Sequence, residues 1–574
     1  MTDSSHYPRF SDTRSRRNHA APRMLVIGLD GATYDVLTPL AYAGVMPNLA
    51  SLMRRSALAE LNSTLPFTTP VAWTSFQTGA DAQTHGVLDY RYLDHERRQV
   101  MLNHAGRIAC PTLFEQVSAI GDVVALNLPM TFPPSPRTRG LIVGGLDSPS
   151  AEAALGRCPK LLDRLQAEGV HYHINTIWKR KPETFDELAH GVARTIDTYR
   201  SRARAAEIAD ELVDWRLMVV QFQTLDSFQH RCWHLLAEGA ETADAASIAE
   251  ARRAMRALDD AIGRLLEMAS AKGAAVAVLG DHGFGPFREK ICVNEVLRRR
   301  GLLKSASWSN QRRYRVARSL WKMRRYLGRR FAGTRSAILR RPLSALAPID
   351  WRQTRAFAVH GELAGLVYLN DRERFEDGAL AATRQREQAE ADALAAFREA
   401  VHPRTGEPLF EEVYAVREAF GIDPIERRWP DIVAIPADGF QTRAKFSRGE
   451  RLLVDDPTLT GTHRRVSALM VEGPASGTGG GHTAEMRDVA PTILHLLGLP
   501  PLPHMTGRVL TEMLAISPTE SMLRAGRIGR HLRAAHAHSH PHAMVPKGYP
   551  TDTIVSHREQ AVVEQRLREL GYLE

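Results

Sequence analysis

The stretch Met24-Leu25-Val26-Ile27-Gly28-Leu29-Asp30 is a short apolar run that ends at an acid. Apolar runs of this length are typical of strands that are buried on both faces of a parallel sheet. The runs 217–222 and 274–279 have the same character, and an aspartate follows each of them within four residues. The three stretches therefore predict three strands of one sheet, each with a carboxylate beyond its carboxyl end.

Stretches that favour helix, such as 189–211 and 244–270, lie between these strands. Alternating strands and helices predict an α/β fold with a mainly parallel central sheet flanked by helices. In such folds ligands bind beyond the carboxyl ends of the strands, which is where the aspartates are expected.

The chain has 574 residues, more than one core usually contains, so we expect a large domain with insertions. The order of the expected elements divides it into five parts. They are a disordered N-terminus (1–23), a core (24–300 and 431–516), a basic helical insertion (301–350), a smaller α/β subdomain (351–430), and a C-terminal tail with a histidine-rich linker and a terminal helix (517–574).

The net charge of +10 comes from one segment. Residues 301–345 contain thirteen lysines and arginines and no acid, so the rest of the chain is slightly acidic. Over 312–331, apolar residues recur at helical spacing opposite an arginine-rich face, which predicts a basic amphipathic helix. Such a helix suits an anionic membrane surface or an anionic substrate. A charge confined to one segment argues against a specific nucleic-acid partner.

Cysteine usage and hydropathy favour a cytoplasmic protein. Any contact with a membrane is expected to be peripheral, at the inner membrane face. The four cysteines lie far apart without Cys-x-x-Cys spacing, which argues against a disulfide framework or a cysteine zinc site. Residues 1–23 contain no apolar signal-peptide core, and no apolar run reaches the roughly 20 residues that cross a bilayer. The histidines within 531–542 are interpreted as part of a surface linker rather than a metal site.

Four short clusters of acids and histidines carry the candidate chemistry. Together they offer three carboxylates and three imidazoles, enough ligands for two divalent metal ions. The spacing of Asp226 and His230 places both side chains on one helical face or one tight loop. The adjacent Asp281 and His282 can both reach one ion from a loop that leaves a strand. The clusters are Gly28–Gly31, Asp226–His230, Asp281–Gly283 and Gly461–Arg464.

Around these clusters the chain resembles the alkaline phosphatase superfamily, and most of all its type I phosphodiesterase/nucleotide pyrophosphatase-like branch. The resemblance extends over 24–516, and 566–573 resembles the end of bacterial predicted phosphohydrolases or phosphomutases. It implies a two-metal hydrolase of phosphoric esters, with Zn²⁺ as the usual metal and Mn²⁺ or Fe as alternatives. The strings that carry it are Gly28–Asp30, Thr68–Gly79, His85-Gly86, Asp281–Phe287, Gly461–Arg464 and Asp488–Pro500.

The resemblance also implies a role for each ligand. The nucleophile is itself one of the ligands of the first metal. The reaction proceeds through a covalent phosphothreonine intermediate on this nucleophile. The implied ligands are Asp30, Asp281 and His282 for the first metal, and Asp226, His230 and His463 for the second.

The nucleophile is expected at the start of a helix. In the resembled superfamily it typically stands two residues before a proline, which selects Thr68 before Pro70 and makes Thr68 a ligand of the first metal. A helix N-terminus stabilises both an alkoxide and a bound phosphate. The stretch from Pro70 to Gly79 is one residue longer than in the nucleotide pyrophosphatases, which keeps Thr69 as an alternative. Either threonine could instead serve only as the helix N-cap.

The chain departs from two related patterns. Nucleotide pyrophosphatases have an Asn shortly after the nucleophile that donates to a phosphate oxygen, whereas this chain has Val71-Ala72-Trp73. This difference leaves diester specificity open. Sulfatases need a Cys or Ser in a Cys/Ser-x-Pro-x-Arg setting, which Thr68–Ala72 does not provide, so a sulfatase is disfavoured.

Three further histidines compete with the assigned ligands. His482 follows three glycines and resembles a metal loop, but His463 directly precedes an expected strand, as the ligand of the resembled family does, so we prefer His463. His234 is interpreted either as a support for the metal site or as a structural residue. His85 is expected to be structural and to close the turn after the nucleophile helix.

Three functions remain compatible with the sequence. The first is hydrolysis of a phosphorylated small-molecule or lipid-linked substrate. The second is a phosphotransferase or phosphomutase, because the same covalent intermediate can pass its phosphoryl group to an alcohol. The third is a membrane-surface or polyanion-binding protein with a degenerate site, which the complete ligand set argues against.

Overall fold

The computed structural model describes residues 22–305, 349–515 and 557–570, apart from short gaps at 97, 179, 238–242, 446–450 and 474–475. The predicted amphipathic helix at 312–331 and the histidines within 531–542 lie outside the described residues.

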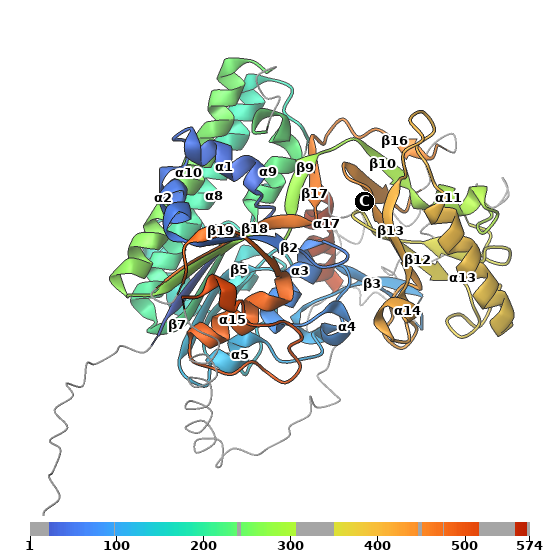
Figure 1. Cartoon of the computed structure of the whole chain (residues 1–574), viewed down its shortest axis with the longest axis horizontal. Helices are drawn as coiled ribbons and strands as arrows, with labels where there is room; N and C mark the ends of the chain where they lie inside the picture. The colour runs from blue at the N-terminus through green and yellow to red at the C-terminus, as the bar shows by residue number, and fades with distance from the viewer. Residues whose placement is uncertain are drawn as a thin grey trace, which may run out of the picture.

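An eight-stranded sheet forms the centre of the larger lobe (Figure 1). Its strands are β1 (Met24–Leu29), β2 (Ala57–Asn62), β5 (Asp122–Leu128), β6 (Gly140–Gly144), β7 (Trp215–Phe222), β8 (Ala275–Leu279), β18 (Val466–Glu472) and β19 (Gly479–Glu485). Their order is β19-β2-β18-β8-β1-β7-β5-β6, and only β18 runs antiparallel to the others. The predicted α/β fold with a mainly parallel sheet is confirmed.

Alternating side chains of β1 reach two different helix layers. Leu25 and Ile27 pack with one cluster of buried side chains, and Met24 and Val26 pack with another on the opposite face. A strand that is buried on both faces in this way has no polar face, which explains its continuous apolar sequence. One layer contains α1 (Tyr34–Tyr42), α2 (Pro47–Arg55), α8 (Phe185–Leu212) and α10 (Ala245–Ala271), and the other contains α3 (Thr69–Thr78), α5 (Leu113–Val117) and α15 (Val489–Leu496).

A smaller lobe lies beside the central sheet (Figure 1). It contains a four-stranded sheet, a three-stranded sheet and the helices α11 (Val293–Arg299), α13 (Thr383–Arg398) and α14 (Val416–Phe420). The four-stranded sheet has the order β11-β12-β14-β13 and the other the order β15-β10-β16. Their strands are β11 (Ala356–Ala358), β12 (Gly365–Leu369), β13 (Phe410–Ala415), β14 (Ile432–Pro436), β10 (Glu289–Cys292), β15 (Phe440–Arg443) and β16 (Leu453–Val454).

The boundaries expected at 300 and 431 differ from this topology. Strand β14 was assigned to the core, but it pairs with β12 and β13 of the smaller lobe. Strand β10 and helix α11 also pack into the smaller lobe. The reason is that an apolar strand such as Ile432–Pro436 has the same sequence character in either sheet, so composition alone cannot assign it.

The tail returns to the larger lobe through α17 (His557–Leu570), which confirms the expected terminal helix. Val563 and Leu567 pack against Tyr90 and Leu146. Within the described ranges no single helix is long and apolar enough to cross a membrane, and only α1 and α2 taken as one pair, bent by 107°, meet that criterion of length and composition.

Candidate active site

The topology of the sheet brings the acid clusters together. Strand β1 pairs in parallel with both β7 and β8, so the segments that follow these strands leave the sheet at one edge. Asp30 follows β1, and Asp281 and His282 follow β8. Asp226 lies in the first turn of α9 (Thr224–Cys232), which begins two residues after β7.

Asp30, Asp281 and His282 form the first candidate metal group. All three residues are fully buried. Nε2 of His282 lies 3.5 Å from Oδ1 of Asp30 and 3.5 Å from Oδ2 of Asp281. Nδ1 of His282 hydrogen-bonds the carbonyl oxygen of Gly283 at 3.0 Å, which directs Nε2 toward the carboxylates.

The other oxygen of each carboxylate is already held by the protein. Oδ2 of Asp30 accepts hydrogen bonds from Nε1 of Trp73 at 3.1 Å and from Nε2 of Gln221 at 2.7 Å. Oδ1 of Asp281 accepts one from the backbone N–H of Gly31 at 3.1 Å. In contrast, Oδ1 of Asp30 and Oδ2 of Asp281 are buried and accept no hydrogen bond from any described residue. Both oxygens are in place to bind a cation, and Oγ1 of Thr68 is buried and unpaired in the same way.

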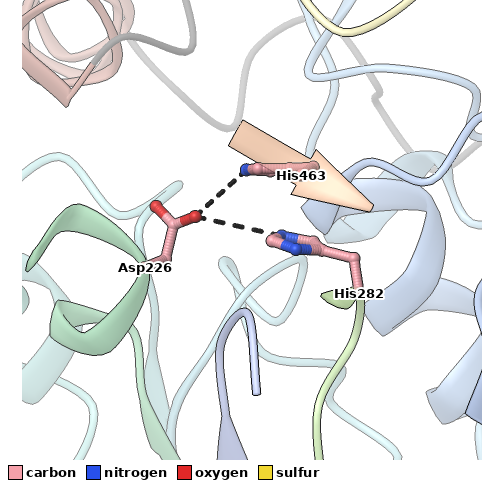
Figure 2. A group of neighbouring side chains, drawn as sticks. All are labelled: Asp226, His282 and His463. Carbon is pink, nitrogen blue, oxygen red and sulfur yellow. Dashed lines mark hydrogen bonds and ion pairs between the residues drawn. The ribbon is translucent and has the colours of Figure 1, made fainter. Parts of the chain in front are cut away.

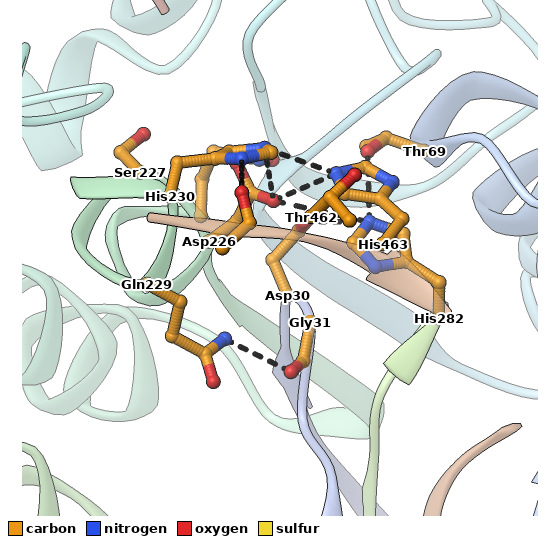
Figure 3. Close-up of polar contacts among 12 residues, drawn as sticks. Asp30, Gly31, Thr69, Asp226, Ser227, Gln229, His230, His282, Thr462 and His463 are labelled. Carbon is orange, nitrogen blue, oxygen red and sulfur yellow. Dashed lines mark hydrogen bonds and ion pairs between the residues drawn. The ribbon is translucent and has the colours of Figure 1, made fainter. Parts of the chain in front are cut away.

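Asp226, His230 and His463 lie beside the first group (Figure 3). Oδ1 of Asp226 is 3.0 Å from Nε2 of His463 and 3.3 Å from Nε2 of His230. Asp226 and His230 are four residues apart on α9, so of the two expected arrangements, one helical face or one tight loop, the structure has the helical face. His463 comes from β17 (Gly461–Arg464), which pairs with β9 (Gly283–Pro286) directly after His282.

His282 connects the two groups. Figure 2 shows one oxygen of Asp226 facing both His463 and His282, and Nε2 of His282 lies 4.0 Å from Oδ1 of Asp226. The rings of His282 and His463 are stacked with their centroids 3.5 Å apart. Asp226, His282 and His463 therefore also satisfy the geometry of one metal group. All six predicted ligands converge on one buried site.

The first group favours a bound positive charge. Burial raises the pKa of Asp30 well above its ordinary value, and the charge of Asp281 adds to this rise. Burial likewise raises the pKa of Asp281. Burial acts to lower the pKa of His282, but the charges of Asp281 and Asp30 outweigh it and raise this pKa to about 9. Among the described residues, two buried carboxylates thus have only one positive group, the protonated His282 side chain, to balance their charge.

The second group has the opposite balance. Burial acts to raise the pKa of Asp226, but the charge of His230 and the hydrogen bonds from His230 and His463 outweigh it, and this pKa lies well below its ordinary value. Burial, with the charge of His282, lowers the pKa of His463 to about 3. Near neutral pH, Asp226 is a carboxylate and His463 is a neutral imidazole, which are the forms that bind a metal.

The residues fit two divalent cations. The donor set is three carboxylates and three imidazoles, which suits Zn²⁺ and similar borderline metals. A cation bound at the first group would satisfy the two buried carboxylate oxygens and would take the place of the proton on His282.

The nucleophile expected at Thr68 is not the threonine that contacts the ligands. Helix α3 begins at Thr69, and Thr68 is its N-cap residue without a side-chain capping bond. Oγ1 of Thr69 lies 3.4 Å from Nε2 of His282 (Figure 3), whereas Oγ1 of Thr68 makes no hydrogen bond to any described residue. The geometry therefore favours the alternative, Thr69.

The competing histidines occupy other places. His482 lies on the edge strand β19 and belongs to neither candidate metal group. His234 lies in a short 3-10 helix after α9. His85 is fully buried, where its Nε2 contacts Oγ of Ser75 at 3.0 Å and its Nδ1 accepts from the N–H of Val87 at 3.2 Å. These bonds tie the turn after α3 to that helix.

Comparison with known families agrees with this geometry. The family described as type I phosphodiesterase / nucleotide pyrophosphatase matches residues 24–464, which is well over half of the chain. The chain belongs to this family. The resemblance inferred from the sequence motifs is confirmed, and the chain is a hydrolytic enzyme. No curated protein matches it.

Solved structures similar to this chain include those of a murine and a human protein of the same name. Murine ectonucleotide pyrophosphatase / phosphodiesterase 5, an inactive variant in complex with AMP, is 12% identical with a TM-score of 0.48. The human ectonucleotide pyrophosphatase / phosphodiesterase 5 is 13% identical with a TM-score of 0.47. Each alignment covers 86% of this chain and 100% of the other.

Two residues that sequence reasoning had not assigned complete the site of the phosphodiesterase. Trp73 and Gln221 hold Asp30, and Asn127 in turn donates to Gln221 at 3.0 Å. One signal for Trp73 is Gly28, because a Cβ atom at Gly28 would lie 2.6 Å from the Trp73 ring. Gln221 is a polar residue inside an otherwise apolar strand, which is the corresponding signal for a buried hydrogen-bonding role.

Proposed function

We propose that this phosphodiesterase cleaves phosphoric esters at a two-metal centre with Thr69 as the nucleophile. The observation that carries the proposal is the 3.4 Å contact between Oγ1 of Thr69 and Nε2 of His282, at the start of α3. Asp30, Asp281 and His282 would hold one divalent cation beside Thr69, and Asp226, His230 and His463 the other. We favour Zn²⁺, with Mn²⁺ or Fe as alternatives.

The chemistry follows from the position of Thr69. When bound, the cations favour the deprotonated form of a hydroxyl or a water and offset the charge on the transferred phosphoryl group. The N-terminus of α3 adds its partial positive charge at the same place. Oγ1 of Thr69 gives up its proton to water and attacks phosphorus, the bond from phosphorus to the leaving oxygen breaks, and the leaving oxygen takes a proton from water and departs as an alcohol. Water then attacks the phosphothreonine, which releases the phosphate product and restores the hydroxyl.

The residues around Asp30 hold its carboxylate in the orientation that these reaction steps require. Trp73 and Gln221 fix one oxygen of Asp30, so the other oxygen stays turned toward His282 without a search through rotamers. Burial of every ligand excludes bulk water and strengthens each electrostatic interaction in the site.

An activity panel tests the proposal. Metal-loaded protein is assayed with an aryl phosphate monoester, an aryl phosphate diester and a dinucleotide pyrophosphate, and the variants Thr68→Ala and Thr69→Ala are assayed with the best of them. We expect Thr69→Ala to be inactive and Thr68→Ala to retain turnover. Equal activity of the Thr69→Ala variant and the native protein would refute Thr69 as the nucleophile. An alcohol added as acceptor then distinguishes the two reactions. Phosphoryl transfer yields phosphorylated alcohol, whereas hydrolysis does not.

A further inference from the structure

A pocket lined by arginines lies between the two lobes. Four arginines line it: one from β3 (Arg91–Asp94), one from the short 3-10 helix Ala105–Arg107, and two from the turn before β14. We call it the arginine pocket. Its charged lining comprises Arg91, Arg107, Arg427, Arg428 and Asp89, with His360 beside them.

The arginine pocket adjoins the start of α3. A second pocket is lined by Thr68 and Pro70, which flank the proposed nucleophile Thr69. The two pockets share Leu88, Asp89 and Leu366 in their walls. The pocket beside Thr68 and the arginine pocket therefore lie on two sides of one shared wall.

Buried hydrogen bonds fix the wall of the arginine pocket. Nδ1 of His360 lies 2.8 Å from Oδ2 of Asp89, and its Nε2 lies 2.7 Å from the hydroxyl of Tyr368. Nε1 of Trp429 donates to the carbonyl oxygen of Gly86 at 3.2 Å. These bonds link the larger lobe to the four-stranded sheet, so the arginines are presented by a defined surface.

Protein carboxylates already neutralise two of the four arginines. Arg91 pairs with Glu362 at 2.8 Å, and Arg428 lies 3.4 Å from Asp94. Asp89 is engaged by His360 and by the N–H of Tyr90 at 2.7 Å. Within the described part of the chain no carboxylate pairs with Arg427. The lining therefore presents a guanidinium group that can take an external anion.

We propose that the arginine pocket binds a second phosphate group of the substrate, with Arg427 as its main contact. The planar guanidinium matches the geometry of phosphate oxygens and forms paired, charge-assisted hydrogen bonds with them. The substrate class is then a phosphate ester whose organic part carries a further phosphate. This inference rests on the proposed function for the position of the first phosphate, but it assigns a separate binding site.

Bisphosphates of graded length test the proposal. Alkanediol bisphosphates with two to six carbons and alkyl monophosphates of equal length are compared as inhibitors of aryl phosphodiester hydrolysis by the full chain. At the best length, the bisphosphate should inhibit about tenfold more tightly than its monophosphate. In Arg427→Ala this ratio should fall to about one. The matched control is Arg417→Ala, an arginine outside the pocket that pairs with Asp423, and it should keep the native ratio.

A ratio near one at every length, or an unchanged ratio in Arg427→Ala, would overturn the second phosphate site. Calorimetric titration of the same compounds into the metal-loaded protein gives the ratio without turnover. If the protein hydrolyses no phosphoric ester but still binds the bisphosphate more tightly through Arg427, the proposed function fails and the arginine pocket stands. If hydrolysis occurs without any preference for the bisphosphate, the pocket fails and the proposed function stands.

Discussion

Oγ1 of Thr69 lies 3.4 Å from Nε2 of His282, although Thr69 begins a helix and His282 follows a strand more than two hundred residues later. The contact is buried and joins the helix N-terminus to the ligand shared by both candidate metal groups. It places a hydroxyl where a cation and a helix dipole both favour negative charge.

Replacing Thr69 removes the proposed attacking oxygen. We expect Thr69→Ala to lower kcat for an aryl phosphodiester by at least about a thousandfold, because the variant lacks the oxygen that would attack phosphorus. Thr69→Ser keeps the oxygen and should retain most of the turnover. The matched control is Thr68→Ala, which we expect to change kcat by less than about tenfold. A larger loss in Thr68→Ala than in Thr69→Ala would reverse the assignment.

Metal content should separate the two candidate groups. Elemental analysis of the native protein is expected to give about two divalent ions per chain, and Asp281→Asn or Asp226→Asn about one. Each substitution removes an anionic ligand from one group, so the affinity of that group falls. Retention of the native metal content in both variants would contradict the assignment of the ligands.

Gln221 acts through Asp30 rather than on the substrate. We expect Gln221→Leu to weaken metal binding about ten- to a hundredfold, because one oxygen of Asp30 loses its donor and the carboxylate is freer to rotate. Titration with chelator measures the affinity, and excess metal should restore much of the turnover. A loss of turnover that no metal concentration restores would show that Gln221 has a different role.

His85 makes folding sensitive to acid. Burial lowers its pKa to about 3, whereas an unfolded chain has a histidine pKa near 6.5. As the pH falls, His85 therefore binds a proton in the unfolded state before it does so in the folded state. The contribution of His85 to stability is complete above pH 6.5 and is lost as the pH falls toward 3, by up to about 4–5 kcal/mol. Urea unfolding of native protein and His85→Gln at pH 7 and pH 4.5 should show a smaller loss of stability in the variant. An equal loss in both would exclude His85 as the source.

Much of the site could be predicted because it depends on strand ends. The apolar runs before Asp30, Asp226 and Asp281 predicted strands of one mainly parallel sheet, and in the structure these three strands adjoin one another. The four-residue spacing of Asp226 and His230 predicted one helical face or one tight loop, and the structure has the helical face. Periodicity and position relative to a strand are local properties, so the sequence alone carries them.

Other features depend on distances between segments that are remote in sequence. The choice between Thr68 and Thr69 turns on one residue of register at the start of α3, and the contact of Thr69 with His282 could not be foreseen from the sequence. Trp73 and Gln221 meet at Asp30 from a helix and a strand, and neither has a motif that predicts the contact. The lobe boundary at β14 depends on pairing partners, which the apolar sequence of that strand does not specify.

Trapping the covalent intermediate tests the central claim most directly. Metal-loaded protein is mixed with an aryl phosphodiester, quenched in acid during turnover, digested and mapped by mass spectrometry. The account predicts one phosphoryl adduct on Thr69 in the native protein and none after treatment with chelator. An adduct on Thr68, or continued turnover with no adduct on any residue, would contradict it.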